Sequence, residues 1–237
     1  MSYKIIGIPF CSNLLNNKEP NITPNKIKVD EIIEVDNLNK DVGLKQIEEK
    51  TKNVERSIFL GGDHSISYAL VKAIKPDLLV VFDAHADLIK ATATITNEDW
   101  LRALINESII KPSNVLIIGL RNYDKQEMDF IKQNSIAFFN LDREEWFNMD
   151  DVADFIMEKI KDKQRIYLSI DIDVINGSEI NANFKEPFGF SSREMLYILQ
   201  RIAKLKEKVI AIDIVEAIAS HDLTKKIVES IIKLFNE

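Results

Sequence analysis

A chain of 237 residues, 46% of them hydrophobic, is long enough to bury a sizeable core, and we expect one α/β domain over residues 1–237. The formal net charge of −7 and the lack of a clustered Lys/Arg stripe exclude a nucleic-acid partner. The sequence has no signal-peptide layout and no segment of membrane-spanning length, so we expect a cytoplasmic protein without a membrane partner. A single cysteine, Cys11, fits a reducing compartment and excludes a cysteine metal cluster.

Short apolar runs alternate along the chain with longer segments of helical spacing, which predicts parallel strands covered on both faces. The predicted strands are residues 4–8, 31–35, 57–60, 78–82, 115–119, 136–141, 165–170 and 209–215. The predicted helices are residues 65–74, 97–107, 124–133, 150–161, 191–205 and 222–235. Residues 16–26, NNKEPNITPNK, are the most loop-like, and no repeat or Pro/Gly-rich linker indicates a domain boundary.

Polar side chains follow four of the predicted strands at the point where each apolar run ends. They are His64 after SIFLGGD, Asp83, His85 and Asp87 after LLVVF, Asp171 and Asp173 after RIYLSI, and Glu216 after VIAIDIV. Ligands of open α/β sheets bind beyond the carboxyl ends of the strands, so these residues share one edge of the sheet. A spacing of two residues in an extended segment directs the side chains to the same side, which predicts one common pocket.

Aspartates crowded into one pocket repel each other unless cations lie between them. Carboxylate and imidazole ligands without thiolate suit Mn²⁺, with Zn²⁺, Co²⁺ and Fe²⁺ as alternatives. Two ions bridged by shared carboxylates would lie about 3.5–4 Å apart and would ionise a water at neutral pH. The pattern therefore predicts two divalent cations per chain, Mn²⁺ or one of these alternatives.

Each motif also has a simpler interpretation when it is taken alone. An isolated Asp-x-Asp after a strand is typical of a turn or helix cap, and GGDHS is compatible with a glycine turn followed by a capped helix. A glutamate such as Glu216 is common at the start of a loop or helix. Asp213, inside the last strand, is interpreted as structural. The combination of six ligand-type residues on successive strand ends favours the metal site.

The segments GGDHS (61–65), DAHAD (83–87), SIDID (169–173) and DIVEA (213–217) resemble, in order, those of the ureohydrolase family of arginases, agmatinases and formiminoglutamases. IIGLRNYDKQE (117–127) and EPFGFSSRE (186–194) are also similar to family segments. The resemblance implies a three-layer α/β/α sandwich around an eight-stranded parallel sheet, assembled as a homo-oligomer.

The resemblance also implies a role for each residue. One manganese would be held by His64, Asp83, Asp87 and Asp171, and the other by His85, Asp83, Asp171 and Asp173. Glu216 would pair with the guanidinium group of a small-molecule guanidino substrate. Asp87 would accept a hydrogen bond from the attacking hydroxide and pass a proton to the departing amine. The products would be urea and an amine.

Three features depart from the family pattern. Asn97 stands nearest to the position of a loop histidine, and an amide cannot shuttle a proton. Asn176 and Gly177 replace an aspartate and a proline after SIDID, and the chain before GGDHS is abbreviated. Asn97 is either a substrate-binding residue or the cap of the helix that begins NEDWLRAL.

The sequence is compatible with two functions. The first is an active hydrolase, with agmatine preferred over arginine because no convincing loop for an α-amino acid head group is present. The second is a diverged metal-binding homologue with weak or no catalysis and a regulatory or assembly role.

Overall fold

The structure is a computed structural model that describes residues 2–12, 20–54, 56–91, 94–141 and 148–237. Residues 16–19 of the predicted loop lie outside the described ranges. The remainder of that loop contains a 3₁₀ helix, η1 (Pro20–Asn25).

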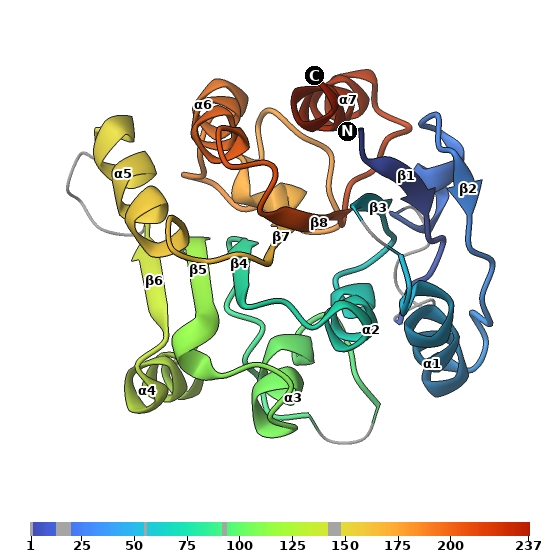
Figure 1. The fold of residues 1–237 in the computed structure, drawn as a ribbon, viewed down its shortest axis with the longest axis horizontal. Helices are drawn as coiled ribbons and strands as arrows, with labels where there is room; N and C mark the ends of the chain where they lie inside the picture. The colour runs from blue at the N-terminus through green and yellow to red at the C-terminus, as the bar shows by residue number, and fades with distance from the viewer. Residues whose placement is uncertain (1, 13–19, 55, 92–93, 142–147) are drawn as a thin grey trace.

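An eight-stranded sheet forms the middle layer (Figure 1). Its strands are β1 (Lys4–Gly7), β2 (Glu31–Ile32), β3 (Ser57–Leu60), β4 (Leu78–Phe82), β5 (Val115–Leu120), β6 (Ala137–Asn140), β7 (Ile166–Asp171) and β8 (Val209–Val215). Their order is β2-β1-β3-β8-β7-β4-β5-β6, and every neighbouring pair is parallel. The predicted strand over 31–35 is only a two-residue edge strand.

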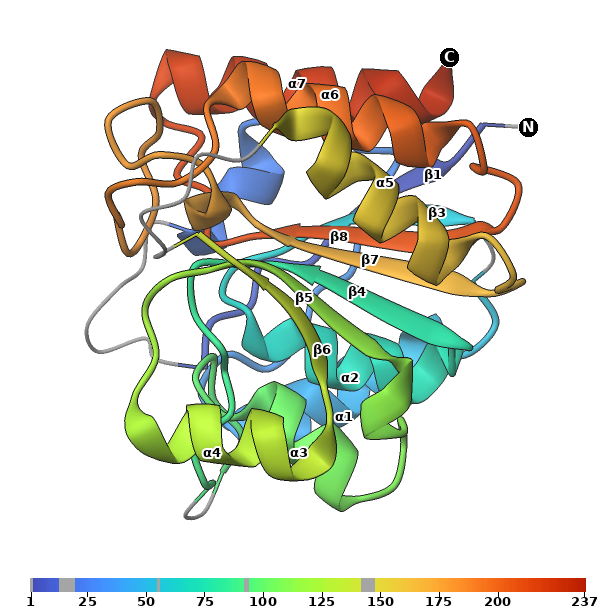
Figure 2. The same ribbon diagram turned by 90° about the vertical axis from the view of Figure 1, so that its left-hand side faces the viewer.

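Helices cover both faces of the sheet, as Figure 2 shows. One face carries α1 (Lys40–Thr51), α2 (Ser65–Ile74), α3 (Trp100–Asn106) and α4 (Lys125–Asn134). The other carries α5 (Met149–Ile160), α6 (Ser192–Ala203) and α7 (Asp222–Asn236). The predicted three-layer α/β/α fold is confirmed.

The two hydrophobic cores follow from the alternation of side chains along each strand. In β4, Val80 and Phe82 pack into the core beneath α5, α6 and α7, whereas Leu79 and Val81 pack into the core beneath the other helices. All four side chains are at most 1% exposed. A strand that is buried on both faces has a continuous run of apolar residues. The run LLVVF therefore predicted β4 correctly.

Helix α1 was not predicted, because its sequence contains a glycine and few apolar residues. Asn39 caps this helix by accepting a hydrogen bond from the Val42 backbone N–H. A Cβ atom at Gly43 would lie 2.4 Å from both the Asp36 carbonyl oxygen and the Phe10 ring. Gly43 is therefore required by close packing, although glycine lowers helix propensity.

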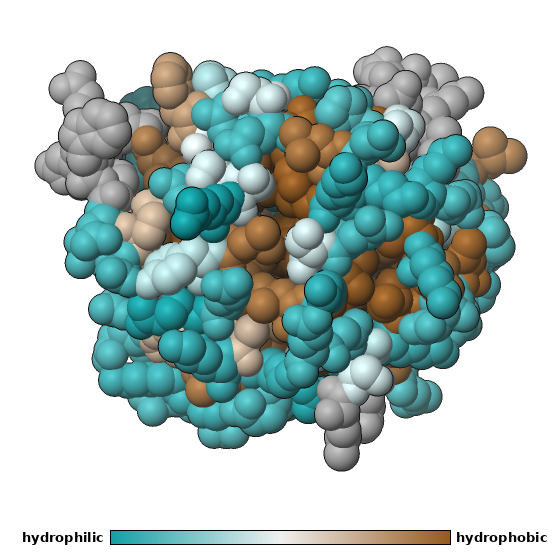
Figure 3. Space-filling model, turned by 90° about the horizontal axis from the view of Figure 1, so that it is seen from above, coloured by the Kyte–Doolittle hydropathy of each residue, from teal (hydrophilic) through white to brown (hydrophobic). Residues whose placement is uncertain are grey.

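Polar side chains dominate the surface over α5, α6 and α7, but hydrophobic side chains reach the surface in an area between them (Figure 3). None of the helices in the described ranges has the length and apolar character needed to cross a membrane.

The four central strands, β3, β8, β7 and β4, place the residues that follow them at one end of the sheet. Gly62, between β3 and His64, lies directly against the chain that follows β1. A Cβ atom at this position would lie 1.9 Å from the Phe10 carbonyl oxygen. The approach of these two segments fixes the path of the chain into His64.

We expect Gly62→Ala to destabilise the fold by about 1–3 kcal/mol, because the added methyl group overpacks a buried backbone contact. Thermal unfolding should show a decrease in Tm of about 2–4 °C per kcal/mol for a chain of this size. Lys45→Ala, on the exposed face of α1, is the control and should leave Tm nearly unchanged. A Gly62→Ala variant with the Tm of the wild type would contradict this packing constraint.

Candidate metal centre

His64 is presented at the start of α2 by a buried turn. Asp63, 2% exposed, accepts hydrogen bonds from the Ser12 backbone N–H at 2.6 Å and the Ser12 hydroxyl at 2.8 Å. The His64 backbone N–H donates to Glu216 Oε1 at 3.0 Å. These contacts tie the turns after β1, β3 and β8 together.

The DAHAD segment is not an extended strand beyond Phe82, contrary to the expectation from its spacing. Asp83 Oδ1 accepts a hydrogen bond from the His85 backbone N–H at 2.7 Å, and Asp87 has a positive φ of 53°. Asp173 likewise lies in a short 3₁₀ helix, η3 (Ile172–Val174), after β7. The side chains still converge, because local turns aim them rather than strand alternation.

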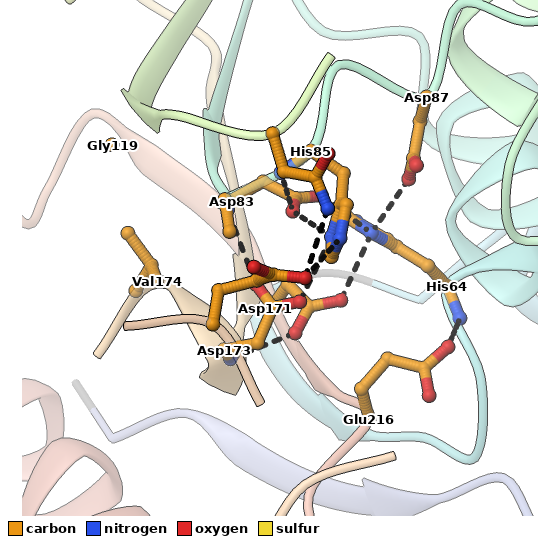
Figure 4. Close-up of polar contacts among 12 residues, drawn as sticks. His64, Asp83, His85, Asp87, Gly119, Asp171, Asp173, Val174 and Glu216 are labelled. Atoms are coloured by element: carbon orange, nitrogen blue, oxygen red, sulfur yellow. Dashed lines mark hydrogen bonds and ion pairs between the residues drawn. The ribbon is translucent and has the colours of Figure 1, made fainter. Parts of the chain in front are cut away.

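Two groups of side chains meet at the carboxyl ends of the central strands (Figure 4). His64 Nδ1 lies 3.0 Å from Asp83 Oδ2, 3.0 Å from Asp87 Oδ2 and 3.4 Å from Asp171 Oδ2. The second group is formed by His85, Asp83 and Asp173, in which His85 Nδ1 lies 2.9 Å from Asp173 Oδ2 and 3.5 Å from Asp83 Oδ1. Asp83 contributes one oxygen to each group.

The hydrogen bonds of His64 indicate which of its nitrogens can bind a cation. Ser169 Oγ donates its proton to Asp213 Oδ1 at 2.7 Å, so it accepts from His64 Nε2 at 2.9 Å. In the neutral ring, Nδ1 then has a lone pair facing three carboxylates, and it makes no hydrogen bond with the described residues. Asp83 Oδ2 is also buried without a hydrogen bond to any described residue. This donor set fits a divalent cation.

Electrostatic repulsion shifts the pKa values of the buried carboxylates. Burial and the neighbouring Asp173 and Asp83 raise the pKa of Asp171 well above its usual range. Burial and Asp83 raise the pKa of Asp87 to about 7. Burial opposes the charged form of His64, but the carboxylates of Asp171, Asp83 and Asp87 that face Nδ1 outweigh it and raise the pKa of His64. A cation would replace the protons that the metal-free site retains.

Glu216 lies on the turn after β8, where it has a positive φ of 59°. Its side chain is 2% exposed and lines the same cavity as the two groups. Burial and the nearby Asp63 raise the pKa of Glu216 to about 8. Burial therefore favours the neutral acid, and a cationic partner beside Glu216 would stabilise its charged form.

Asn97 also lines the cavity, but it is not a helix cap. Helix α3 begins at Trp100 instead of the predicted residue 97, and the cap position belongs to Asp99. Asn97 lies in the preceding turn, where Thr96 N–H donates to Asp99 Oδ1 at 2.7 Å. The capping interpretation of Asn97 is therefore wrong.

The cavity has a volume of about 380 Å³ and an acidic lining. Eight carboxylate side chains line it, Asp87, Glu98, Asp124, Glu127, Asp171, Asp173, Glu186 and Glu216. Two imidazoles, His64 and His85, lie among them, and neither lysine nor arginine is present in the lining within the described part of the chain.

Several site residues were missed from the sequence. Trp100 Nε1 donates to Asp87 Oδ2 at 2.6 Å, and its ring lies 4.6 Å from the His64 ring. Ser169 lies within the quoted SIDID motif, but only the fold shows that it contacts His64. Glu186 and Phe184 reach His85 from a loop whose sequence has no recognisable ligand pattern.

The fold and this site define an α/β protein with a candidate metal centre of carboxylates and imidazoles. A sequence model described as the Arginase family matches residues 5–236. The chain therefore belongs to the arginase family, and the resemblance to the ureohydrolases is confirmed.

The individual relatives described next differ from this chain at most aligned positions. Arginase from Staphylococcus aureus (strain MRSA252) is 29% identical over 208 residues, which cover 79% of this chain and 67% of that protein. Agmatinase from Pyrococcus horikoshii is 33% identical over 161 residues, covering 67% of this chain and 53% of that protein. The crystal structure of formimidoylglutamase from Bacillus subtilis has a TM-score of 0.87 at 19% identity, covering 99% of this chain and 85% of that chain.

We expect Asp171→Asn to abolish stabilisation by Mn²⁺ without destabilising the metal-free protein. Wild-type Tm should rise by about 5–10 °C in excess Mn²⁺, since a ligand at 100 times Kd adds about 2.7 kcal/mol. Because the pKa of Asp171 is raised in the folded state, its stabilising contribution is present below pH ~4 and is lost as the pH rises. Asn avoids that loss, so the Tm of the metal-free variant should equal or exceed that of the metal-free wild type at pH 7.

Differential scanning calorimetry from pH 4 to 8, with EDTA or with Mn²⁺, checks both parts. A persistent Mn²⁺ shift in Asp171→Asn, or a lower metal-free Tm, would contradict the placement of this carboxylate.

Proposed function

We propose that this protein hydrolyses a small guanidino compound to urea and an amine, with agmatine as the preferred substrate. The observation that carries the proposal is the convergence of two imidazoles and four buried aspartates, three of which line one acidic cavity together with Glu216. Membership of the arginase family supports the same class of reaction.

Two Mn²⁺ ions would occupy the centre. His64, Asp83, Asp87 and Asp171 would hold one ion, and His85, Asp83, Asp171 and Asp173 would hold the other. When bound, such ions act as Lewis acids that lower the pKa of a water toward neutrality and make it nucleophilic. The imidazole nitrogens facing the carboxylates support this assignment.

Glu216 would orient the substrate. A carboxylate can accept two N–H groups of a planar guanidinium, which fixes the plane of the reacting carbon. The positive φ of Glu216 and the hydrogen bond from the His64 backbone N–H hold this carboxylate rigidly beside the candidate metal centre.

Asp87 would handle the proton in the second half of the reaction. Its Oδ2 atom accepts the Trp100 indole N–H, so its Oδ1 atom would accept a proton from the attacking water. The same atom would then return that proton to the departing amine nitrogen. Asn97 would contact the substrate through its amide, since it lines the cavity and cannot exchange a proton.

The acidic lining supports agmatine over arginine. The second charged group of agmatine is a primary ammonium at the far end of its chain, whereas arginine carries an α-carboxylate beside its ammonium group. That carboxylate would face the acidic wall of the cavity, where the described residues provide no lysine or arginine. Repulsion between the α-carboxylate and the acidic side chains disfavours binding of arginine.

The direct test on manganese-loaded protein is a urea assay with agmatine, arginine and guanidinobutyrate, together with a formamide assay with formiminoglutamate, whose formimino carbon cannot yield urea. Urea release from agmatine with the highest kcat/KM is expected. Tight Mn²⁺ binding without turnover of any of these compounds would favour the diverged homologue with a regulatory or assembly role, for which Asn97 in place of a proton-shuttling side chain is the specific argument.

A homo-oligomer is also part of the proposal, with no nucleic-acid or membrane partner. The hydrophobic side chains that reach the surface between α5, α6 and α7 support self-assembly (Figure 3). Sedimentation velocity of the purified chain distinguishes an oligomer from a monomer.

Glu216→Gln should lower kcat/KM for agmatine by about 30-fold or more, because loss of one partner from a buried charge pair costs ~2–5 kcal/mol. Metal content should not change, since Glu216 is not a proposed ligand. Steady-state kinetics and metal analysis on the same sample measure both quantities. Normal kcat/KM in this variant would mean that the guanidinium is anchored elsewhere.

Asn97→His should raise kcat and add an ionisation near pH ~6.5, because a well-placed imidazole acid contributes ~10²–10⁴-fold to proton transfer. The measurement is kcat against pH for both proteins. Asn97→Gln is the matched control, since it keeps the amide and should add no ionisation. A histidine variant with unchanged or lower kcat and no new ionisation would exclude Asn97 from the shuttle position.

A further inference from the structure

The two imidazoles of the centre differ in exposure and in what holds them from outside. His64 is 1% exposed, whereas the side chain of His85 is 25% exposed. Behind His64, the Ser169 hydroxyl accepts from Nε2 and is itself bonded to buried Asp213. Behind His85, Nε2 faces a carboxylate directly, at 3.4 Å from Glu186 Oε1.

Glu186 is held in place beside His85 from two directions. Asn122 Nδ2 donates to Glu186 Oε1 at 2.9 Å. Asn122 is in turn paired with His85 by a parallel backbone bridge, so the two partners of Glu186 belong to adjoining segments. The backbone of Glu186 is fixed by the Gly177 N–H, which donates to the Glu186 carbonyl oxygen at 2.9 Å.

Arg121 fastens the loop that carries Glu186 to the turn that carries Asp173. Its Nη2 donates to the Asp173 carbonyl at 2.6 Å and to the Glu186 carbonyl at 3.3 Å, and its Nε donates to the Pro187 carbonyl at 2.7 Å. A planar guanidinium with fixed donor directions suits such a clamp. Arg121 therefore positions two carboxylate residues around His85: Glu186, which faces Nε2, and Asp173, which faces Nδ1.

Phe184, from the same loop, completes the surroundings of His85. Its ring meets the imidazole edge to face, with ring centroids 6.0 Å apart and planes inclined at 72°. The imidazole thus has Asp173 and Asp83 at Nδ1, Glu186 at Nε2 and an aromatic ring against it.

We propose that Glu186 is a positioning residue that sets the cation affinity of the His85 group. At 3.4 Å from Nε2, Glu186 is placed to take the proton on that nitrogen, so that Nδ1, which is directed at Asp173 and Asp83, is left to bind the cation. A carboxylate behind a ligating imidazole fixes its tautomer and orientation and increases its basicity. The inference deepens the proposed function, since it rests on the metal centre assigned there.

The main alternative is that Glu186 contacts the substrate. Its side chain is 24% exposed and lines the cavity, so it could pair with the distal cation of agmatine. That role would alter KM for agmatine and leave cation binding unchanged.

Mn²⁺ titration of the full chain, with free Mn²⁺ measured by electron paramagnetic resonance, separates these roles. Wild type should show two binding steps, and His85→Ala identifies the step that belongs to His85. Glu186→Ala should weaken that step by about 10–100-fold and leave the other step unchanged. Glu186→Gln keeps an acceptor oxygen, so its loss should be smaller.

Two control variants match these changes. Glu98→Ala removes a carboxylate from the same cavity that forms no ion pair with either imidazole in the described part of the chain, and it should leave the His85 step unchanged. Ser169→Ala removes the acceptor behind His64, so it should weaken the other step instead.

A spectroscopic readout tests positioning without any metal. The chain has only three histidines, so ¹⁵N imidazole spectra of the metal-free protein are readily assigned with single variants. In the wild type at neutral pH, the N–H signal of His85 Nε2 should show the downfield shift of an imidazole N–H directed at a carboxylate. In Glu186→Ala that shift should be lost, whereas the His64 signals stay unchanged.

The possible outcomes test the proposed metal centre and the role of Glu186 separately. A wild type that binds fewer than two Mn²⁺ would overturn the proposed metal centre itself. Two wild-type steps that Glu186→Ala leaves intact, with unchanged His85 spectra, would overturn only the role of Glu186. A rise in KM for agmatine without any change in the His85 step would assign Glu186 to substrate binding instead.

Discussion

Repulsion among buried carboxylates at the ends of β3, β8, β7 and β4 is the constraint on which the site depends. Asp83, Asp171 and Asp173 are at most 3% exposed, and they cannot all be ionised at low energetic cost in metal-free protein. The fold nevertheless brings them within contact of two imidazole nitrogens. Such an arrangement is unfavourable for stability alone, and a bound divalent cation reverses the sign of its electrostatic energy. The crowded carboxylates therefore lower the stability of the metal-free protein and raise its affinity for divalent cations.

Rigid surroundings are needed to maintain that arrangement. Neither ligand-bearing segment after β4 and β7 continues as regular strand, so turns, buried hydrogen bonds and helix starts direct the side chains. Trp100 holds Asp87, Ser169 and Asp213 hold His64, and the Arg121 clamp joins the loop of Glu186 to the turn of Asp173. Outer contacts of this kind determine how well metal ligands are oriented. The helices matter to function mainly through the positions of their first residues.

The sequence predicted the sheet and six ligand-type residues because buried parallel strands have continuous apolar runs, and the polar residues directly follow them. Local detail was harder to predict. Helix α1 was missed since Gly43 packs against Phe10, a contact between segments far apart in sequence. Asn97 was assigned to a helix that begins three residues later, because residues 97–99 form a turn before that helix. Glu186 opens the segment EPFGFSSRE, but its approach to His85 was not predicted, since it depends on a loop that folds back onto this histidine.

The shared carboxylate is the most direct test of a two-cation centre, because Asp83 has one oxygen in each group of ligands. Metal analysis after equilibration with saturating Mn²⁺ should give two ions per chain for the wild type and none for Asp83→Ala. Glu98→Ala, which removes the same charge from the cavity wall, should retain two. A wild type with at most one ion, or an Asp83→Ala variant with two, would contradict the binuclear centre.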